Sequence, residues 1–204
     1  MEIQYYGANC VRLSTKKAVV VVDDLDGSVT KSGDIALFTG AHGMPKAGVK
    51  LCIDQPGEYE VSNISVQGVA ARAHMDVEGK VSATIFKIVA DDVRVVVTGH
   101  VYPDLSDGQL EALGVVDVLI VPVGGSGYTL DGVGALQVIK EIEPKMIIPT
   151  HYADKNIKYE VPQVSLEDAL KELAMEPKET VPKLKLKHGE IHEIMHLVVL
   201  ENSK

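Results

Sequence analysis

The sequence predicts a layered α/β protein in which two β-sheets are packed together with helices outside them. The first hundred residues consist mainly of short β-rich runs separated by Gly, Asp, Asn and Lys, such as "AVVVVDD" at 18–24 and "VRVVVTG" at 93–99. After residue 100, helical patterns alternate with nearly all-apolar runs such as "VDVLIVPV" at 116–123. Strands first, then strands and helices in alternation, favour a layered α/β architecture.

The strands expected in the first half are short and closely spaced. They lie at 2–7, 10–14, 18–24, 34–39, 50–54, 64–70, 82–92 and 93–99. The last two form an expected hairpin that turns at Asp91 and Asp92, because apolar residues continue on both sides of this polar pair. This half of the chain is therefore predicted to be mostly sheet.

Three helices are expected in the second half, each with a side chain suited to cap its first turn. Ser106 with Gln109 has capping-box spacing, and Gly114 follows the end of that short helix. Asp131 caps the pattern that ends at Pro144, and Ser165 opens a third helix. Further strands are expected at 145–152, 182–187 and 196–201.

Length and charge limit the number of domains and the classes of partner that the protein can have. A chain of 204 residues is most simply one domain, 1–204. Its formal charge of -9 and its lack of a basic cluster argue against nucleic acid as a partner. No run is apolar and long enough for a membrane span, so a cytoplasmic protein without a membrane partner is expected. Cys10 and Cys52 form no CxxC pair and are expected to be reduced thiols.

Four of the seven histidines follow predicted strands. His42 comes after the run at 34–39, His74 after 64–70, His100 after 93–99 and His151 after "KMIIPT". Loops at strand ends are where a rigid scaffold presents functional side chains. If these loops share one edge of the sheets, four imidazoles converge.

Five stretches carry a family resemblance: "YYGANCVRL" at 5–13, "AVVVVDD" at 18–24, "QPGEYEVSNISVQGV" at 55–69, "VVVTGHVYPDLSDGQLEALGVVDVLIVPVGG" at 95–125 and "YTLDGVGALQVIKEIEPKMIIPTHY" at 128–152. In these stretches the chain resembles the metallo-β-lactamase superfamily, specifically its small Zn-dependent hydrolase-like branch related to ascorbate-6-phosphate lactonase. The resemblance implies an αββα sandwich with a metal site at one edge.

The chain departs from the metal-binding pattern of that superfamily. The HxHxDH loop, aligned on 34–39, falls on residues 40–45, and only its second histidine is kept, as His42. Met44 and Pro45 stand at the Asp and last His of the loop. The resemblance keeps two further ligand positions as His74 and His151 and puts His100 where the bridging aspartate normally lies. The resemblance therefore implies a degenerate metal loop.

The donor set that the resemblance implies suits one zinc ion better than two. A two-metal hydrolytic site needs about six or seven ligands with a bridging carboxylate, whereas a catalytic zinc needs three ligands and a water. His42, His74 and His151 would bind the zinc, with His100 as a fourth ligand or as a donor behind them. Neutral imidazoles would leave the zinc its full charge and make hydroxide available at about pH 7.

Two acidic residues and one loop complete the candidate site. Asp76 and Asp104 could orient an imidazole or act as a general base, although their positions favour exposed turn aspartates. The loop formed by Gly125, Ser126, Gly127 and Tyr128 lies between a strand and a helix, so its amides could bind a substrate anion. The trio His188, His192 and His196 is expected in a loop and a strand rather than in a site.

Two functions of different classes follow from these observations. One is a mononuclear metal-dependent hydrolase of a small ester, lactone or phosphodiester. The other is a non-catalytic member that binds a ligand or a partner and has an eroded metal site. In either case a small molecule is the expected substrate or ligand, and assembly into a homo-oligomer is left open.

Overall fold

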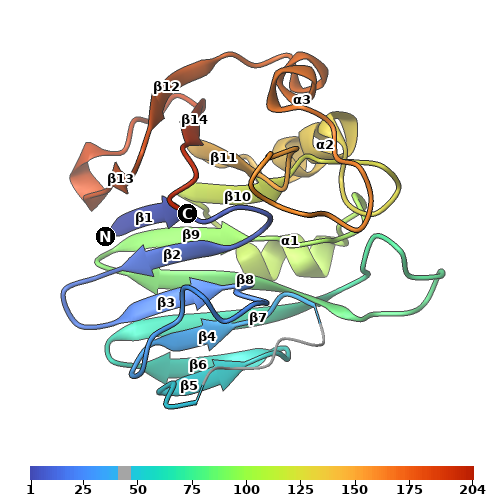
Figure 1. Cartoon of the computed structure of the whole chain (residues 1–204). Helices are drawn as coiled ribbons and strands as arrows, with labels where there is room; N and C mark the ends of the chain where they lie inside the picture. Colours follow the sequence, from blue (N-terminus) through green and yellow to red (C-terminus); the bar gives the residue numbers. More distant parts are fainter. Residues whose placement is uncertain (41–46) are drawn as a thin grey trace.

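Two β-sheets are stacked face to face in the computed structural model, which describes residues 1–40 and 47–204 (Figure 1). The first sheet has the order β13 (Leu184–Lys185), β1 (Glu2–Tyr5), β2 (Val11–Ser14), β3 (Val19–Val22), β4 (Ile35–Leu37) and β5 (Leu51–Ile53). The second has the order β12 (Pro177–Val181), β14 (His196–Leu200), β11 (Met146–Thr150), β10 (Val118–Pro122), β9 (Val93–Val97), β8 (Ala83–Ala90), β7 (Ile64–Ala71) and β6 (Gly57–Val61).

Both sheets are mixed, and this mixture decides where the loops gather. Strands β6 to β9 pair antiparallel, whereas β9, β10, β11 and β14 run parallel to one another. Because β7 and β9 are separated by one antiparallel neighbour, β7 points the same way as β9, β10 and β11. The segments that follow these four strands therefore leave the sheet at the same edge.

The sandwich is held together by strand residues that alternate between two cores. In β10, Val118 and Ile120 pack between the sheets, while Leu119 and Val121 pack on the outer face beneath the helices. All four of these side chains are fully buried. Strand β10 is therefore apolar on both faces, as expected for a covered parallel strand.

The three α-helices of the described residues all contribute to the core on the outer face of the larger sheet. They are α1 (Asp107–Leu113), α2 (Gly132–Ile142) and α3 (Leu166–Leu173), and a 3₁₀ helix covers His188–Glu190. The predicted two-sheet sandwich with helices outside is thus confirmed. The outer face of the smaller sheet carries a minor cluster of Cys10, Val21 and Val29 instead of an α-helix from the described part of the chain.

The predicted helix ends are confirmed by their capping bonds. Ser106 and Gln109 form a reciprocal capping box at α1. The side chain of Asp131 accepts a bond from the amide of Gly134 in α2, and that of Ser165 accepts one from Asp168 in α3. These caps satisfy backbone N–H groups that a helix start leaves without a partner.

One hairpin was predicted correctly, and two strands, β6 and β12, lie outside the strands that the apolar pattern predicted. Asp91 and Asp92 adopt φ angles of 52° and 60°, which suits a two-residue turn between Ala90 and Val93. Strand β12 was not expected, because "PKETV" begins with proline and is largely exposed. It forms an edge strand that pairs only with β14, so tertiary pairing rather than an apolar pattern defines it.

Neither cysteine is part of a disulfide, as predicted. Cys10 is buried and Cys52 is half-buried, and both are free thiols. Burial raises the pKa of the Cys10 thiol well above its ordinary value, so it is an unreactive core residue. Within residues 1–40 and 47–204, no helix has the length and apolar character needed to cross a membrane.

Candidate functional site

Three of the four predicted histidines come together at the shared strand edge. His74 follows β7, His100 follows β9 and His151 follows β11. The rings of His100 and His151 meet edge to face, with centroids 4.5 Å apart. The amide of His74 donates to the carbonyl of His100 over 2.8 Å, so these two residues are neighbours as well. His42, the fourth histidine of the prediction, lies outside the described residues.

His151 is held in an unusual backbone conformation by several contacts. Its φ angle is 56°, in the left-handed region, and its amide donates to the carbonyl of Ala8 over 2.7 Å. Its Nδ1 lies 3.1 Å from Oε1 of Gln163, whose own amide nitrogen donates to the carbonyl of Val161. Because Oε1 can only accept, Nδ1 of His151 carries the proton and Nε2 keeps the free lone pair.

Two further imidazole nitrogens are buried without a partner. Nδ1 of His74 and Nδ1 of His100 have no hydrogen-bond partner in the part of the chain that the structure describes. Burial, together with the nearby imidazoles of His151 and His74, lowers the pKa of His100 from 6.5 to about 3. Burial also lowers the pKa of His151, although its bond to Gln163 opposes this. At neutral pH, His100 and His151 are therefore neutral nitrogen donors.

Aromatic side chains surround the histidine cluster. The ring of Tyr128 lies 5.0 Å from that of His100, and the ring of Tyr159 lies 5.1 Å from that of His151. Tyr102 lies 6.2 Å from His74 and is covered on one face by the guanidinium of Arg72, 3.8 Å from its centroid. Aromatic rings thus lie next to each of the three imidazoles.

Comparison with protein families gives these features a context. The chain matches the beta-lactamase superfamily domain over residues 2–151, which is most of its length. The chain belongs to the beta-lactamase superfamily.

Several solved structures are similar to this chain over most of its length. A candidate Zn-dependent hydrolase of the metallo-beta-lactamase superfamily from Thermotoga maritima is 28% identical, with 98% of each chain covered and a TM-score of 0.77. A metallo hydrolase from Ignicoccus hospitalis, at 16% identity, shares the fold over 85% of this chain and 90% of its own, with a TM-score of 0.61. A candidate metal-dependent hydrolase from Parabacteroides distasonis, at 18% identity, shares the fold over 83% of this chain and 87% of its own, with a TM-score of 0.62. None of the curated proteins compared with the chain matches it.

These relatives imply a metal, and the residues of this superfamily member fit one in their chemistry. Buried imidazole nitrogens with no partner among the described residues are of the kind that zinc binds. The fit in position is incomplete, because no three His, Cys, Asp or Glu side chains within residues 1–40 and 47–204 are arranged to hold a metal ion. The described residues therefore supply donors but not a finished ligand set.

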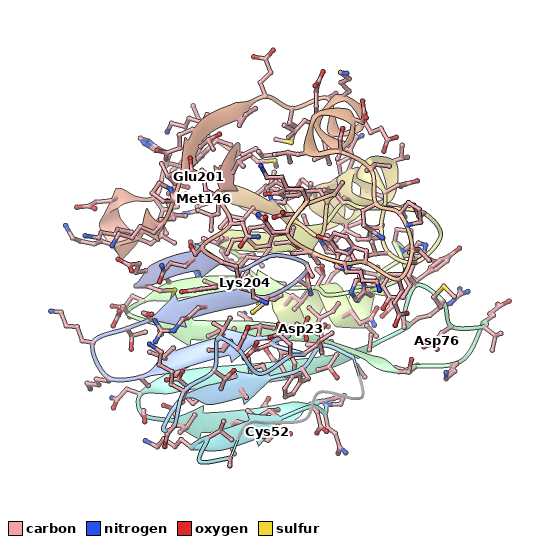
Figure 2. The ribbon with its side chains drawn as sticks, viewed as in Figure 1. Asp23, Cys52, Asp76, Met146, Glu201 and Lys204 are labelled. Carbon is pink, nitrogen blue, oxygen red and sulfur yellow. The ribbon has the colours of Figure 1, made fainter. Side chains whose placement is uncertain are left out.

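Of the two predicted acidic residues, Asp76 is committed to its own loop. Its Oδ2 accepts bonds from the amides of Ala73 and Ser82, both at 3.0 Å, and from the Ser82 hydroxyl at 2.6 Å. Its Oδ1 pairs with Lys80 over 2.9 Å. These partners, the Ser82 bond foremost, lower its pKa well below the ordinary range. Figure 2 shows Asp76 on the loop that projects from the sandwich. Asp104 is exposed on the segment that leads into α1.

The predicted glycine-rich loop lies beside the histidines but is largely closed by its own bonds. The amide of Gly125 donates to the carbonyl of Leu130, and that of Tyr128 donates back to the carbonyl of Gly125. The hydroxyl of Ser126 donates to the carbonyl of Pro162. Ser126 and Gly127 are exposed, and the Tyr128 ring lies edge-on to the His100 ring, with centroids 5.0 Å apart.

Several residues of the site were not predicted from the sequence. Tyr159 and Gln163 belong to an irregular segment with no motif, and Tyr102 and Arg72 look like ordinary surface residues in the sequence. Only the distance in space to His74 and His151 identifies them. Of the trio at the end of the chain, His188 begins a 3₁₀ helix, His188–Glu190, where a loop was expected, and His196 begins strand β14 as predicted.

A pocket of about 750 Å³ lies away from the histidines. Asp91 and Asp92 line it, and they precede β9, whose other end leads to His100. The histidine cluster therefore occupies the opposite edge of the sandwich from this pocket.

Proposed function

We propose that this protein is a single-metal hydrolase of the metallo-β-lactamase fold that acts on a small ester, lactone or phosphodiester. One observation carries the proposal: three imidazoles converge at one edge, and two of them have buried Nδ1 atoms with no partner among the described residues. An unpaired buried nitrogen costs free energy unless a ligand satisfies it. A bound metal ion is the ligand that suits such a nitrogen.

In this proposal His74, His100 and His151 would each supply a ligand to one zinc ion, with His42 as a further candidate that would complete the set. When bound, zinc would polarise the substrate and supply hydroxide at neutral pH. Gln163 keeps His151 in the tautomer that leaves Nε2 free to coordinate. A pKa of about 3 makes His100 a poor general base but leaves its lone pair available at neutral pH.

The substrate would be bound by groups around the imidazoles. Tyr128 is half-buried against His100 and can pack on a substrate group. The exposed turn at Ser126 and Gly127 precedes α2, whose N-terminus favours negative charge. A small anionic or ester substrate satisfies both features.

A non-catalytic role is the second candidate, and one observation favours it. No carboxylate of the described residues contributes to a metal-binding group with the imidazoles, and Asp76 is saturated by its own loop. An attacking water would then have no group to orient it. In this alternative the cluster binds a ligand or a metal without turnover.

Zinc titration into metal-free protein by calorimetry tests the proposal. We expect at most one equivalent bound at the cluster, weakened at least about tenfold by His74→Ala or His151→Ala. His192→Ala is the matched control, because this exposed histidine precedes β14 at the other edge. Assays with bis-(p-nitrophenyl) phosphate and a simple lactone complete the test.

The outcomes separate the candidates. One equivalent with turnover supports the single-metal hydrolase, and one equivalent without turnover supports the non-catalytic member. Two tight equivalents would point to an intact two-metal enzyme, and no binding at neutral pH would refute a metal site of either kind.

A further inference from the structure

A buried polar network lies behind the histidines and connects the two sheets. Asp23, directly after β3, accepts three bonds: from the side-chain amide of Asn9 at 2.6 Å, from the backbone amide of Thr39 at 2.8 Å and from the Thr39 hydroxyl at 2.6 Å. The side-chain oxygen Oδ1 of Asn9 accepts a hydrogen bond of 2.8 Å from the hydroxyl of Thr150. Figure 2 labels Asp23, which directly follows β3.

These four side chains are almost completely excluded from solvent. The exposed fractions are 3% for Asn9, 8% for Asp23, 2% for Thr39 and 0% for Thr150. Burial raises the pKa of Asp23, and the bonds from Thr39 and Asn9 counteract this effect. Hydrogen bonds in such a low-dielectric setting are strong, and losing one leaves a partner unsatisfied.

The network touches the residues that lead into two of the imidazoles. Thr150 directly precedes His151, whose amide donates to Ala8, the neighbour of Asn9. Thr39 packs against Gly99, which directly precedes His100: a Cβ added at Gly99 would lie 2.2 Å from Oγ1 of Thr39. The backbones before His100 and before His151 are therefore both fixed against one network.

We infer that Asn9, Asp23, Thr39 and Thr150 are positioning residues, which set the separation of the His100 and His151 imidazoles for the metal site of the proposed function. Asn9 makes two directional bonds, one toward the smaller sheet and one toward β11 of the larger sheet. The two sheets can then shift relative to each other only if buried bonds break. Ligand sites need side chains held to within about 0.5 Å, and such a bridge provides that.

The chain offers a matched pair of variants for the test. Thr39 donates its hydroxyl to Asp23 over 2.6 Å, and Thr30 donates its hydroxyl to Asp24 over the same distance. Both threonines are buried. The backbone amide of Thr39 also donates to Asp23, and that of Thr30 also donates to Asp24. Thr39→Val and Thr30→Val therefore remove the same kind of bond, but only the first bond belongs to the network.

The readout is the imidazole ¹⁵N resonances of His100 and His151 in metal-free protein at pH 7. We expect Thr39→Val and Thr150→Val to shift these resonances, and Thr30→Val to leave them at the wild-type positions while lowering the unfolding midpoint comparably. Unchanged resonances in both network variants, or equal shifts in Thr30→Val, would overturn the inference.

Serine variants separate the hydrogen bond from packing and cover the case in which a valine variant does not fold. Thr39→Ser and Thr150→Ser keep the hydroxyl and lose a methyl group, so the inference expects wild-type resonances. A role in packing alone predicts the reverse, with serine disturbing the imidazoles more than valine.

Zinc affinity provides a second readout, and it separates the two proposals. We expect Thr39→Val and Thr150→Val to weaken zinc binding about tenfold and Thr30→Val to leave it unchanged. If wild-type protein binds no zinc, the proposed function fails, and the imidazole resonances still decide the positioning role.

Discussion

The imidazole of His151 stands edge-on to that of His100, with an interplanar angle of 88° and ring centroids 4.5 Å apart. Protonation of either ring would place a charge in a buried space beside another nitrogen. Burial and the neighbouring imidazoles accordingly lower the pKa of His100 to about 3. The pair is thus built to stay neutral, and this has a consequence for stability.

The stability of the metal-free protein should fall as the solution is acidified below about pH 6.5. His100 titrates near 6.5 when unfolded and near 3 when folded, so the unfolded chain binds its proton first. The stabilisation is fully present above pH 6.5 and is lost progressively toward pH 3. Because one pKa unit is worth about 1.4 kcal/mol, the loss is on the order of a few kcal/mol.

Urea unfolding at a series of pH values, with a chelator present, measures this loss. His100→Gln removes the titrating group and should flatten the dependence between pH 6.5 and pH 4. Parallel pH profiles for the wild type and the variant would contradict the prediction.

Gly124→Ala should disrupt the site more than an alanine elsewhere. A Cβ at Gly124 would lie 1.9 Å from the carbonyl oxygen of His151 and 2.1 Å from Oε1 of Gln163. The backbone of His151 must then move, at a cost of about 1–3 kcal/mol as in other overpacked sites. Gly108→Ala in α1 is the control, because no atom lies within 4 Å of its added Cβ. Equal unfolding midpoints for the two variants would show that the contact around Gly124 is not tight.

Asp76→Asn should loosen the loop between β7 and β8 without removing a catalytic base. An asparagine nitrogen would face either the Ala73 and Ser82 amides or the Lys80 ammonium, all of which are donors. We expect faster tryptic cleavage after Lys80 and faster amide exchange in residues 73–82. Glu78→Gln, an exposed change in the same loop, should leave both rates unchanged. An Asp76→Asn protein with wild-type loop protection whose pH–rate profile has lost its acidic limb would instead identify a general base.

The sequence predicted the parts of the fold that depend on local patterns. The helix caps at Ser106, Asp131 and Ser165 and the turn at Asp91 and Asp92 follow from residues close together in the chain, and the structure confirms them. Strand β12 could not be predicted, because its exposed residues gain their conformation only by pairing with β14.

The site was predictable only as a set of loops. The histidines that follow predicted strands were expected to converge if their loops share one sheet edge, and the structure brings His74, His100 and His151 together at such an edge. The partners of these histidines could not be foreseen. Gln163 and Asn9 contact segments 12 and 141 residues away in the chain, and no spacing rule connects them.

Zinc-loaded protein should not hydrolyse the β-lactam nitrocefin above background. Efficient two-metal hydrolysis needs a carboxylate that bridges the ions and offsets their charge. By resemblance, His100 occupies the position of that carboxylate, and a neutral imidazole with a pKa of about 3 can neither bridge two ions nor supply negative charge. The nearby Asp76 cannot take over, since both of its oxygens bind Ser82, Lys80 and the Ala73 amide. A spectrophotometric assay beside bis-(p-nitrophenyl) phosphate checks the expectation, and nitrocefin turnover that His74→Ala abolishes would show that a second metal is held by other means.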